Sequence, residues 1–361
     1  MLKKLALFPM TRDMCAVARY PSLLLQKYLL TYLFVPSFMK LDGKDISCLD
    51  GGDSGIATLS DLSKARLADC DTLFLDYDAG LKDLTLYREI IDFANGTEKE
   101  IIMSKTLLQE LGEDTTSWPI DAPVVERQTD RLYEIRTPIL AIYSQNTQTD
   151  QFALELATRK HFIDQGYKVE QISSNNVSQV FGFSSTPDFL YEQRDAYDKI
   201  LKFNTFVKDL TEMKQPDLFI MGVPGAIMKY NMRLLNGLGI IPFVMSTAVN
   251  VDLAALCMHY NSMYDKNIFD EISRYGQYRL GVPIQFINLA NTSIAPDMSS
   301  DIVNSMKLNY INLNSEFVLQ GIKHDLETNG HYLFNVLNNE SAVETCFAMQ
   351  KVLSENAHYM C

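Results

Sequence analysis

Residues 137–172 read TPILAIYSQNTQTDQFALELATRKHFIDQGYKVEQI, and their pattern predicts the fold of the larger part of the chain. Residues 139–143 form a short apolar, β-prone run, which is typical of a buried strand. A polar turn follows at 144–150, then a helix at about 151–165, and then a second strand at 168–172. Strand, turn, helix and strand within about thirty residues indicate a βαβ unit.

The turn at 144–150 occupies the place where nucleotide folds hold phosphate, but its residues do not suit phosphate. A phosphate loop needs glycines, which let the backbone approach the ligand, and a lysine, which supplies positive charge. The turn contains no Gly and no Lys, and Asp150 adds a negative charge. The sequence therefore predicts a nucleotide fold without an ordinary Walker-type ATP or GTP site.

A later strand also ends without the acid that nucleotide-hydrolysing folds use to hold Mg²⁺. Residues 218–225 read LFIMGVPG, an apolar run that leads into a turn containing glycine and proline. If this strand neighbours the strand at 139–143, the two turns converge on one site, suited to a small molecule or an extended peptide backbone. A polar turn at a helix start favours a carboxylate or an amide, and a capped turn without a ligand is the alternative. The candidate ligand-binding residues are Ser144, Gln145, Asn146, Thr147, Thr149, Gly222, Pro224 and Gly225.

Residues 1–111 alternate short apolar runs with helical patterns, which predicts a Rossmann-like α/β domain with a parallel sheet. The expected strands are 4–8, 29–35, 70–76 and 100–103, and the expected helices are 15–24, 60–68 and 86–95. The densest glycine cluster supplies a secondary candidate loop at Gly51, Gly52 and Asp53. This loop is either an anion-binding nest or a tight turn, and the charge of Asp53 argues against phosphate.

Residues 112–136 break all periodicity and are interpreted as a linker, in which Trp118 packs at the domain junction. Residues 137–361 are then a P-loop-NTPase-like α/β domain that lacks the Walker motif. Its further expected helices are 189–213, 268–278, 315–325 and 341–355. Its further expected strands are 240–244, 284–289, 308–313 and 332–337, while 252–259 has helical or strand character. The predicted fold class is α/β, with an amino-terminal Rossmann-like domain and a carboxyl-terminal degenerate P-loop-like domain.

Composition limits the partners and cofactors. A net charge of −13 on 361 residues argues against nucleic acid and anionic membranes as partners. No signal peptide and no apolar run long enough to span a bilayer is visible, so we expect a cytoplasmic protein. None of the six cysteines and five histidines falls at metal-ligand spacing, so we expect no zinc site and no iron–sulfur cluster. The sequence assigns no catalytic residue, and it is compatible with a homo-oligomer.

Six stretches that follow one another along the chain resemble a known family. They are Leu7-Phe8-Pro9, Asp50-Gly51-Gly52, residues 70–74 (CDTLF), residues 166–169 (GYKV), Phe181-Gly182-Phe183 and residues 220–228 (IMGVPGAIM). Through them the chain is similar to a clostridial peptide maturation system family, found in gene clusters that mature ribosomally made, cysteine-rich, bacteriocin-like peptides beside a radical-SAM enzyme. The resemblance implies a precursor peptide or the radical-SAM maturase as partner. A more distant likeness is to two-domain proteins with a Rossmann-like and a P-loop domain.

Three functional hypotheses follow. The first is an accessory protein of peptide natural-product maturation, which binds the precursor peptide or its modifying enzyme. The second is a divergent nucleotide-dependent ligase or kinase, in which the polar turn at 144–150 contacts the nucleotide. The third is a small-molecule-binding regulatory protein that uses the cleft between the two domains. Nucleotide binding separates the second hypothesis from the first, and peptide binding without nucleotide separates the first from the third.

Overall fold

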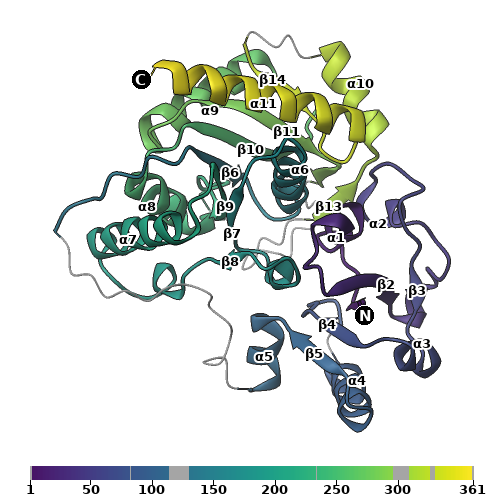
Figure 1. The fold of residues 1–361 in the computed structure, drawn as a ribbon. Coiled ribbons are helices and arrows are strands. Elements are labelled where there is room, and N and C mark those ends of the chain that lie inside the picture. The colour runs from purple at the N-terminus through teal and green to yellow at the C-terminus, as the bar shows by residue number, and fades with distance from the viewer. Residues whose placement is uncertain are drawn as a thin grey trace. The chain divides into compact units, whose positions relative to one another are not determined.

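The computed structural model describes residues 2–81, 83–113, 130–232, 234–295, 309–325 and 330–359. Its contacts divide the chain into two compact units, which are Met1–Ile120 with Asn175–Phe183, and Asp121–Ser174 with Ser184–Cys361. We call them unit 1 and unit 2 (Figure 1). The continuous second domain expected at 137–361 is thus interrupted, because Asn175–Phe183 groups with unit 1. Trp118 and most of the expected linker at 112–136 lie outside the described residues.

Unit 1 is a Rossmann-like α/β unit, and its described strands form a parallel sheet in the order β3-β2-β1-β4-β5. The strands are β1 (Lys3–Phe8), β2 (Tyr28–Val35), β3 (Ser60–Asp61), β4 (Thr72–Leu75) and β5 (Glu100–Met103). The helices are α1 (Cys15–Arg19), α2 (Ser47–Asp50), α3 (Lys64–Ala68), α4 (Thr85–Gly96) and α5 (Lys105–Leu111). The strand order reverses between β1 and β4, which is where open α/β sheets bind ligands.

Two helices of unit 1 are shorter than the sequence predicted. The helix expected at 15–24 ends at Arg19, because Pro21 lacks the N–H that a continuing helix needs, and a 3₁₀ turn follows at Pro21–Leu23. The helix expected at 60–68 was wrong at its start, since β3 pairs with the end of β2 before α3 begins. Ser63 caps α3, and its hydroxyl accepts a hydrogen bond from Arg66 N at 3.4 Å.

Unit 2 is built on a parallel sheet whose described strands lie in the order β14-β11-β10-β6-β9-β7-β8. The strands are β6 (Ile139–Ser144), β7 (Val169–Ser173), β8 (Ser184–Ser185), β9 (Leu218–Ala226), β10 (Leu253–His259), β11 (Ile284–Ala290) and β14 (Tyr332–Phe334). The helices are α6 (Gln151–Asp164), α7 (Ala196–Lys214), α8 (Ile240–Ala248), α9 (Lys266–Arg279), α10 (Ser315–Asp325) and α11 (Asn339–Tyr359). An antiparallel pair, β12 (Thr292–Ala295) and β13 (Asn309–Asn312), extends from the sheet.

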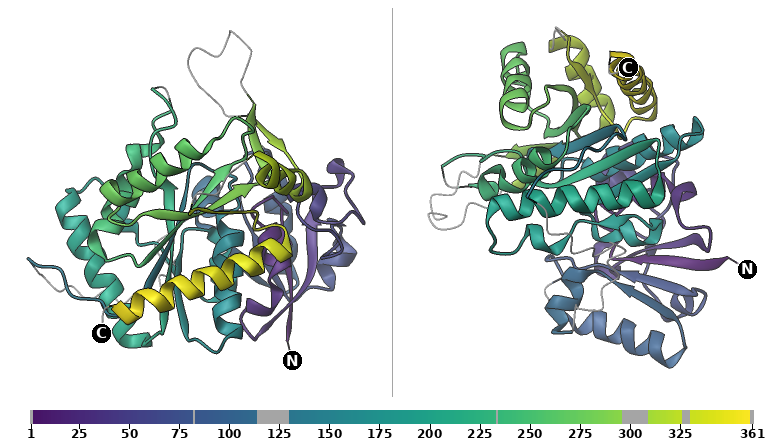
Figure 2. Two further views of the ribbon diagram at one scale, coloured as in Figure 1. Left: turned by 90° about the horizontal axis from the view of Figure 1, so that it is seen from above. Right: turned by 60° about the vertical axis from the view of Figure 1, so that its left-hand side comes forward.

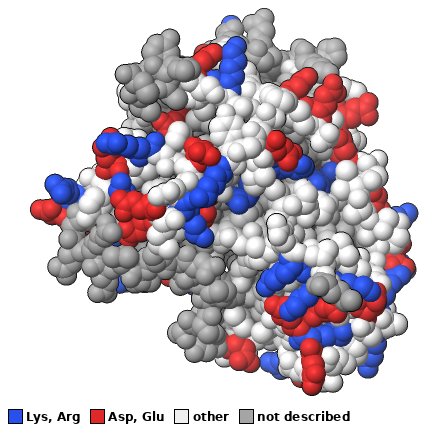
Figure 3. All heavy atoms as spheres, in the orientation of Figure 1, with Lys and Arg blue, Asp and Glu red and all other residues white. Residues whose placement is uncertain are grey.

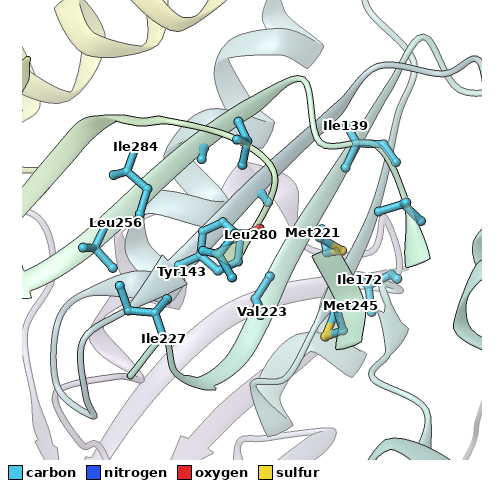
Figure 4. Packing of buried hydrophobic residues seen from close by; sticks show 14 of the residues in the cluster. Ile139, Tyr143, Ile172, Met221, Val223, Ile227, Met245, Leu256, Leu280 and Ile284 are labelled. Atoms are coloured by element: carbon cyan, nitrogen blue, oxygen red, sulfur yellow. The ribbon is translucent and has the colours of Figure 1, made fainter. Parts of the chain in front are cut away.

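Helices cover both faces of the unit 2 sheet. On one face α6 packs with α11, and on the other α7 packs with α8 (Figures 1 and 2). Alternate residues of the central strands point to the α7–α8 face and form a dry core, of which Tyr143, Met221 and Leu256 are part (Figure 4). The hydroxyl of Tyr143 lies 2.6 Å from Ser246 Oγ, so its polar end is satisfied within this core.

The strands that follow β6 in the chain, β7 to β9, lie on one side of it in the sheet. The strands that follow β10, β11 and β14, lie on the other side. Strands β6 and β10 are neighbours, so this reversal places a ligand-binding position at their carboxyl ends. The expected unit of strand, turn, helix and strand is confirmed, but β9 lies between β6 and β7. Among the described residues, no helix is long and apolar enough to cross a membrane.

Residues 240–244 were predicted to be a strand, and this was wrong, because they form the first half of α8. A short apolar run does not distinguish a buried strand from a buried helix. Pro242 falls in the first turn of α8, where its missing N–H has no helical partner to lose. The four residues that immediately precede α8, Asn236 to Gly239, have φ between 48° and 67° and form a left-handed turn.

Candidate functional site

The β6–α6 loop, residues Gln145–Asp150, lies at the carboxyl end of β6, beside the end of β10. Gln145 N donates a hydrogen bond to Cys257 O at 2.8 Å, and Gln145 Oε1 accepts one from His259 N at 3.3 Å. The hydroxyl of Tyr264 also bonds to Gln145, although burial is the larger effect and raises the Tyr264 pKa. Gln145, a candidate ligand-binding residue, is therefore used to fasten the loop to β10.

Two residues of this loop are held in a backbone conformation that favours glycine. Gln148 and Asp150 have φ of 58° and 60°, and each such non-glycine position costs about 1–2 kcal/mol. Hydrogen bonds from neighbouring residues hold them there. Thr292 Oγ1 donates to Gln148 O at 2.9 Å, and Asn291 N donates to Asp150 Oδ2 at 3.1 Å. Strain that is held in place by surrounding contacts is typical of functional loops.

Three buried asparagines tie the β6–α6 loop to the ends of β11 and β14. Asn288 Nδ2 donates to Thr149 O at 3.1 Å, and Asn288 Oδ1 accepts from Val336 N at 2.8 Å. Asn335 Nδ2 donates to Leu289 O at 2.7 Å and to Asn291 Oδ1 at 2.8 Å. All three asparagine side chains are fully buried, so each of these bonds satisfies a group that water does not reach.

Replacing Asn335 with Ala is expected to lower the free energy of unfolding by about 2–4 kcal/mol, because it removes the buried donor that bonds both Leu289 O and Asn291 Oδ1. Urea denaturation of the purified protein measures this change. Asn95→Ala is the matched control, since Asn95 is exposed on α4, and we expect it to stay within about 0.5 kcal/mol of the parent. Equal effects of the two substitutions would contradict the role of the asparagine network.

The hydrogen bonds of Thr292 fix the tautomer of His259. The Thr292 hydroxyl gives its one proton to Gln148 O, so it must accept the bond that joins it to His259 Nδ1 at 2.7 Å. Neutral His259 therefore carries its proton on Nδ1 and its lone pair on Nε2. The Tyr310 ring stacks on His259 with centroids 5.1 Å apart, and the Tyr310 hydroxyl lies 2.9 Å from Thr147 Oγ1.

Asn146 is the loop residue whose bonding is incomplete. Its Oδ1 accepts from Thr147 N at 2.9 Å, and its main-chain oxygen accepts from Thr149 Oγ1 at 3.2 Å. Its Nδ2 is buried and has no hydrogen-bond partner among the described residues. A buried amide donor without a partner costs about 1–3 kcal/mol, and native proteins rarely leave one unless a ligand or water completes it.

The second group of candidate residues lies beside the loop. Strand β9 is the neighbour of β6, as the convergence of the two turns required, and it carries extra residues where Ile142 pairs with Gly222 but Ser144 pairs with Ala226. Ser144 Oγ donates to Gly225 O at 3.0 Å across this bulge. Pro224 sits within it, where its missing N–H breaks no ladder bond. The polar groups of Ser144 and Gly225 thus bond to each other.

Gly222 makes a close approach to a buried side chain that the sequence did not indicate. It lies inside β9, and a Cβ at this position would lie 2.3 Å from Oε1 of Glu155. Glu155 is a buried carboxyl group on α6, and the sequence did not indicate it because it is a single acidic residue between Leu154 and Leu156. Burial raises the pKa of Glu155 to about 7, against hydrogen bonds from Ser173, Gln171 and Gln151 that lower it.

The secondary candidate loop of unit 1 binds a carboxylate of its own. Asp50 is buried, and Arg19 contacts both of its oxygens at 2.8 Å. Gly52 N donates to Asp50 Oδ1 at 2.9 Å, and Arg19 Nη1 donates to Asp53 O at 3.1 Å. Gly51 ends α2 with φ of 70°. The structure therefore places Gly51, Gly52 and Asp53 in a tight turn that surrounds an internal ion pair.

No group of three or more metal-ligating His, Cys, Asp or Glu side chains occurs within the part of the chain that the structure describes. Six residues that sequence reasoning missed hold the candidate site, namely Asn288, Asn291, Asn335, His259, Thr292 and Tyr310. No local pattern marks them, since each lies more than a hundred residues along the chain from the β6–α6 loop. A polar residue at the end of an apolar strand was the one available signal, and it is weak by itself.

No family model and no curated protein sequence matches this chain. Among solved structures, the chain is similar to the crystal structure of a DUF1611 family protein from Anabaena variabilis, with a TM-score of 0.60. That match covers 98% of this chain and 99% of the other at 10% sequence identity. Because the identity is so low, the likeness shows the α/β fold over nearly the whole chain and carries no functional assignment.

Proposed function

We propose that this chain is a cytoplasmic accessory protein of peptide natural-product maturation, and that unit 2 binds the precursor peptide at the β6–α6 loop. The six stretches that resemble the clostridial maturation family support the biological setting. The radical-SAM maturase of the same gene cluster is the second partner that this resemblance implies. The hydrogen-bonding groups of the β6–α6 loop support a peptide as the ligand.

The observation that carries the proposal is the unpaired Nδ2 of Asn146. A buried amide donor calls for an acceptor, and a peptide carbonyl is an uncharged acceptor of the right kind. Phosphate is a poorer match, because the loop contains no Lys and no Gly, and Asp150 places a carboxylate at the start of α6. The position suits a neutral or weakly charged peptide group better than a nucleotide.

An exposed apolar segment follows β9 and supplies the second part of a peptide surface. Met232, Leu235, Leu238 and Ile240 are 79%, 46%, 51% and 43% exposed. The left-handed turn at Asn236–Gly239 contains Leu238 in a backbone conformation that is unfavourable for a residue with a side chain. Such strain is typical of functional segments. On the face drawn in Figure 3, basic side chains stand beside acidic ones. Along α7, Lys202 and Asp198 form such a pair at 3.2 Å. Contiguous exposed apolar patches are typical of protein contact sites, and we propose that these four side chains form one.

A divergent nucleotide-dependent ligase or kinase is the second candidate, and one observation favours it. The β6–α6 loop lies at the reversal point of the sheet and leads into a 14-residue helix, the arrangement in which such folds bind phosphate. The polar side chains of the loop would then have to replace the missing lysine. A regulatory protein that binds a small molecule is the third candidate, distinguished by binding that needs neither peptide nor nucleotide.

Asn146→Ala is expected to weaken peptide binding by about tenfold, the value of one lost hydrogen bond from a buried donor. The probe is a synthetic copy of the cysteine-rich precursor peptide from the same gene cluster, and calorimetry measures its dissociation constant. Asn95→Ala, on the exposed surface of α4, is the matched control and should bind like the parent. Unchanged affinity of Asn146→Ala would remove the β6–α6 loop from the proposal.

A further inference from the structure

Helix α6, which follows the β6–α6 loop, carries a carboxyl group that is buried among neutral side chains. Glu155 is 1% exposed. Its Oε2 accepts hydrogen bonds from Ser173 Oγ at 2.7 Å and from Gln171 Nε2 at 3.1 Å. Its Oε1 accepts one from Gln151 Nε2 at 3.3 Å. Every one of these partners donates, so the arrangement as it stands suits the ionised carboxylate.

The groups that face Glu155 come from three strands and from its own helix. They are Gln151 on α6, Gln171 and Ser173 on β7, and the backbone of Gly222 on β9, while the thiol of Cys257 on β10 lies within range of an electrostatic interaction. Burial, with Asp150 and Glu155 nearby, raises the pKa of Cys257 well above its usual value, so this thiol is neutral. Among the described residues, no cation contributes to the pKa of Glu155, and its charge is set by burial against hydrogen bonding.

Gln171 offers Glu155 a second hydrogen-bonded state. The side chain is fully buried, and its Oε1 has no hydrogen-bond partner among the described residues. Turning the terminal amide by half a rotation exchanges Nε2 and Oε1. A protonated Glu155 then donates its O–H to Gln171 Oε1, whereas an ionised Glu155 accepts from Gln171 Nε2. The pair therefore keeps one hydrogen bond with either charge on the carboxyl group.

Gln151 connects this pair to the β6–α6 loop. Its Nε2 lies 3.3 Å from Glu155 Oε1, 3.1 Å from Ile142 O and 3.0 Å from Val223 O. The two amide protons of Gln151 are thus shared among three acceptors. The charge on Glu155 decides how strongly its carboxyl group competes for them with the two main-chain oxygens. A hydrogen bond to an ionised acceptor is about twice as strong as a neutral one. The ionised carboxylate therefore binds Gln151, the residue that follows the loop, more strongly than the neutral carboxyl group does.

We propose that Glu155 and Gln171 form a proton-operated latch that fixes the β6–α6 loop when Glu155 is ionised and loosens it when Glu155 takes up a proton from solvent. A test of this latch by peptide affinity rests on the proposed function, whereas a test by hydrogen exchange in the loop does not. Peptide affinity should rise by about fivefold as Glu155 loses its proton, which corresponds to the difference between a charged and a neutral hydrogen bond. Glu155→Gln should bind with one affinity across the same pH range.

Hydrogen exchange at the amides of residues 145–151 tests the latch without a ligand. After correction for the intrinsic rate, protection in the parent should rise from about pH 6 to about pH 8, and that in Glu155→Gln should stay constant. Carboxyl NMR of the parent protein provides a test that needs no variant to fold. It should show one Glu carboxyl that titrates near pH 7, far above the usual range.

The outcomes separate the two proposals. If the peptide does not bind but loop protection depends on pH in the parent alone, the latch stands and the proposed function fails. If the peptide binds with the same pH profile in the parent and in Glu155→Gln, the latch is overturned and the proposed function stands. A parent protein with no Glu carboxyl titrating between about pH 6 and about pH 8 also overturns the latch.

Discussion

Gly222→Ala is expected to lower the free energy of unfolding by about 3 kcal/mol or more. The added Cβ would lie 2.3 Å from Oε1 and 2.4 Å from Cδ of Glu155. This carboxyl group is buried and held by three donors, so it moves only by losing hydrogen bonds in a place that water does not reach. Denaturant unfolding of the parent and the variant measures the loss.

Two controls show whether the contact with Glu155 is the cause. Gly96→Ala adds the same methyl group into open space at the end of α4, and we expect a change within about 0.5 kcal/mol. Combining Gly222→Ala with Glu155→Ala removes the collision, so the double variant should be more stable than the sum of the single changes by at least about 1 kcal/mol. Strictly additive effects would mean that Gly222 does not make room for Glu155.

Gly239→Ala is expected to be at least as damaging, because two separate costs meet at one residue. Its φ is 67°, a conformation that costs a side-chain-bearing residue about 1 kcal/mol or more. Its Cβ would also lie 2.0 Å from Ile227 O, and backbone cannot rotate out of the way as a side chain does. We expect a loss of about 3 kcal/mol or more in the free energy of unfolding, or failure to fold.

Gly237 provides a matched control within the same left-handed turn. Its φ is 60°, but a Cβ there would meet no described atom within 4 Å. Gly237→Ala should therefore show the conformational cost alone, about 1 kcal/mol. If the two alanine variants unfold at the same denaturant concentration, the close approach of Gly239 to Ile227 does not matter for stability.

The alternation of elements was predictable because each has a local cause. The apolar run 139–143 and the polar turn after it gave the correct order of β6, loop and α6. Residues 240–244 failed because an apolar run without alternation fits a buried helix as well as a strand. The sequence also could not show that the strand after α7 would insert between β6 and β7, since parallel pairing is decided by contacts far apart along the chain.

The candidate site was only partly predictable for the same reason. The polar residues at 144–150, at the start of a helix, indicated the loop. The strand at 218–225 was expected beside it only on the condition that it neighbours the strand at 139–143, and β6 and β9 do pair. Glu155, His259 and Asn335 carry no local signal, because each is one polar residue in an otherwise apolar segment. Their roles depend on the hydrogen-bond partners that folding brings to them, such as Gln171 for Glu155 and Thr292 for His259.

We propose that the β6–α6 loop binds a peptide acceptor group in place of phosphate. Calorimetric titration of the purified full chain with the precursor peptide, in the presence and absence of millimolar MgATP or MgGTP, tests it most directly. We predict saturable peptide binding that neither nucleotide changes, and no heat from either nucleotide alone. Saturable MgATP or MgGTP binding that is lost in both Asn146→Ala and Thr149→Ala would contradict the claim and favour a nucleotide-dependent enzyme.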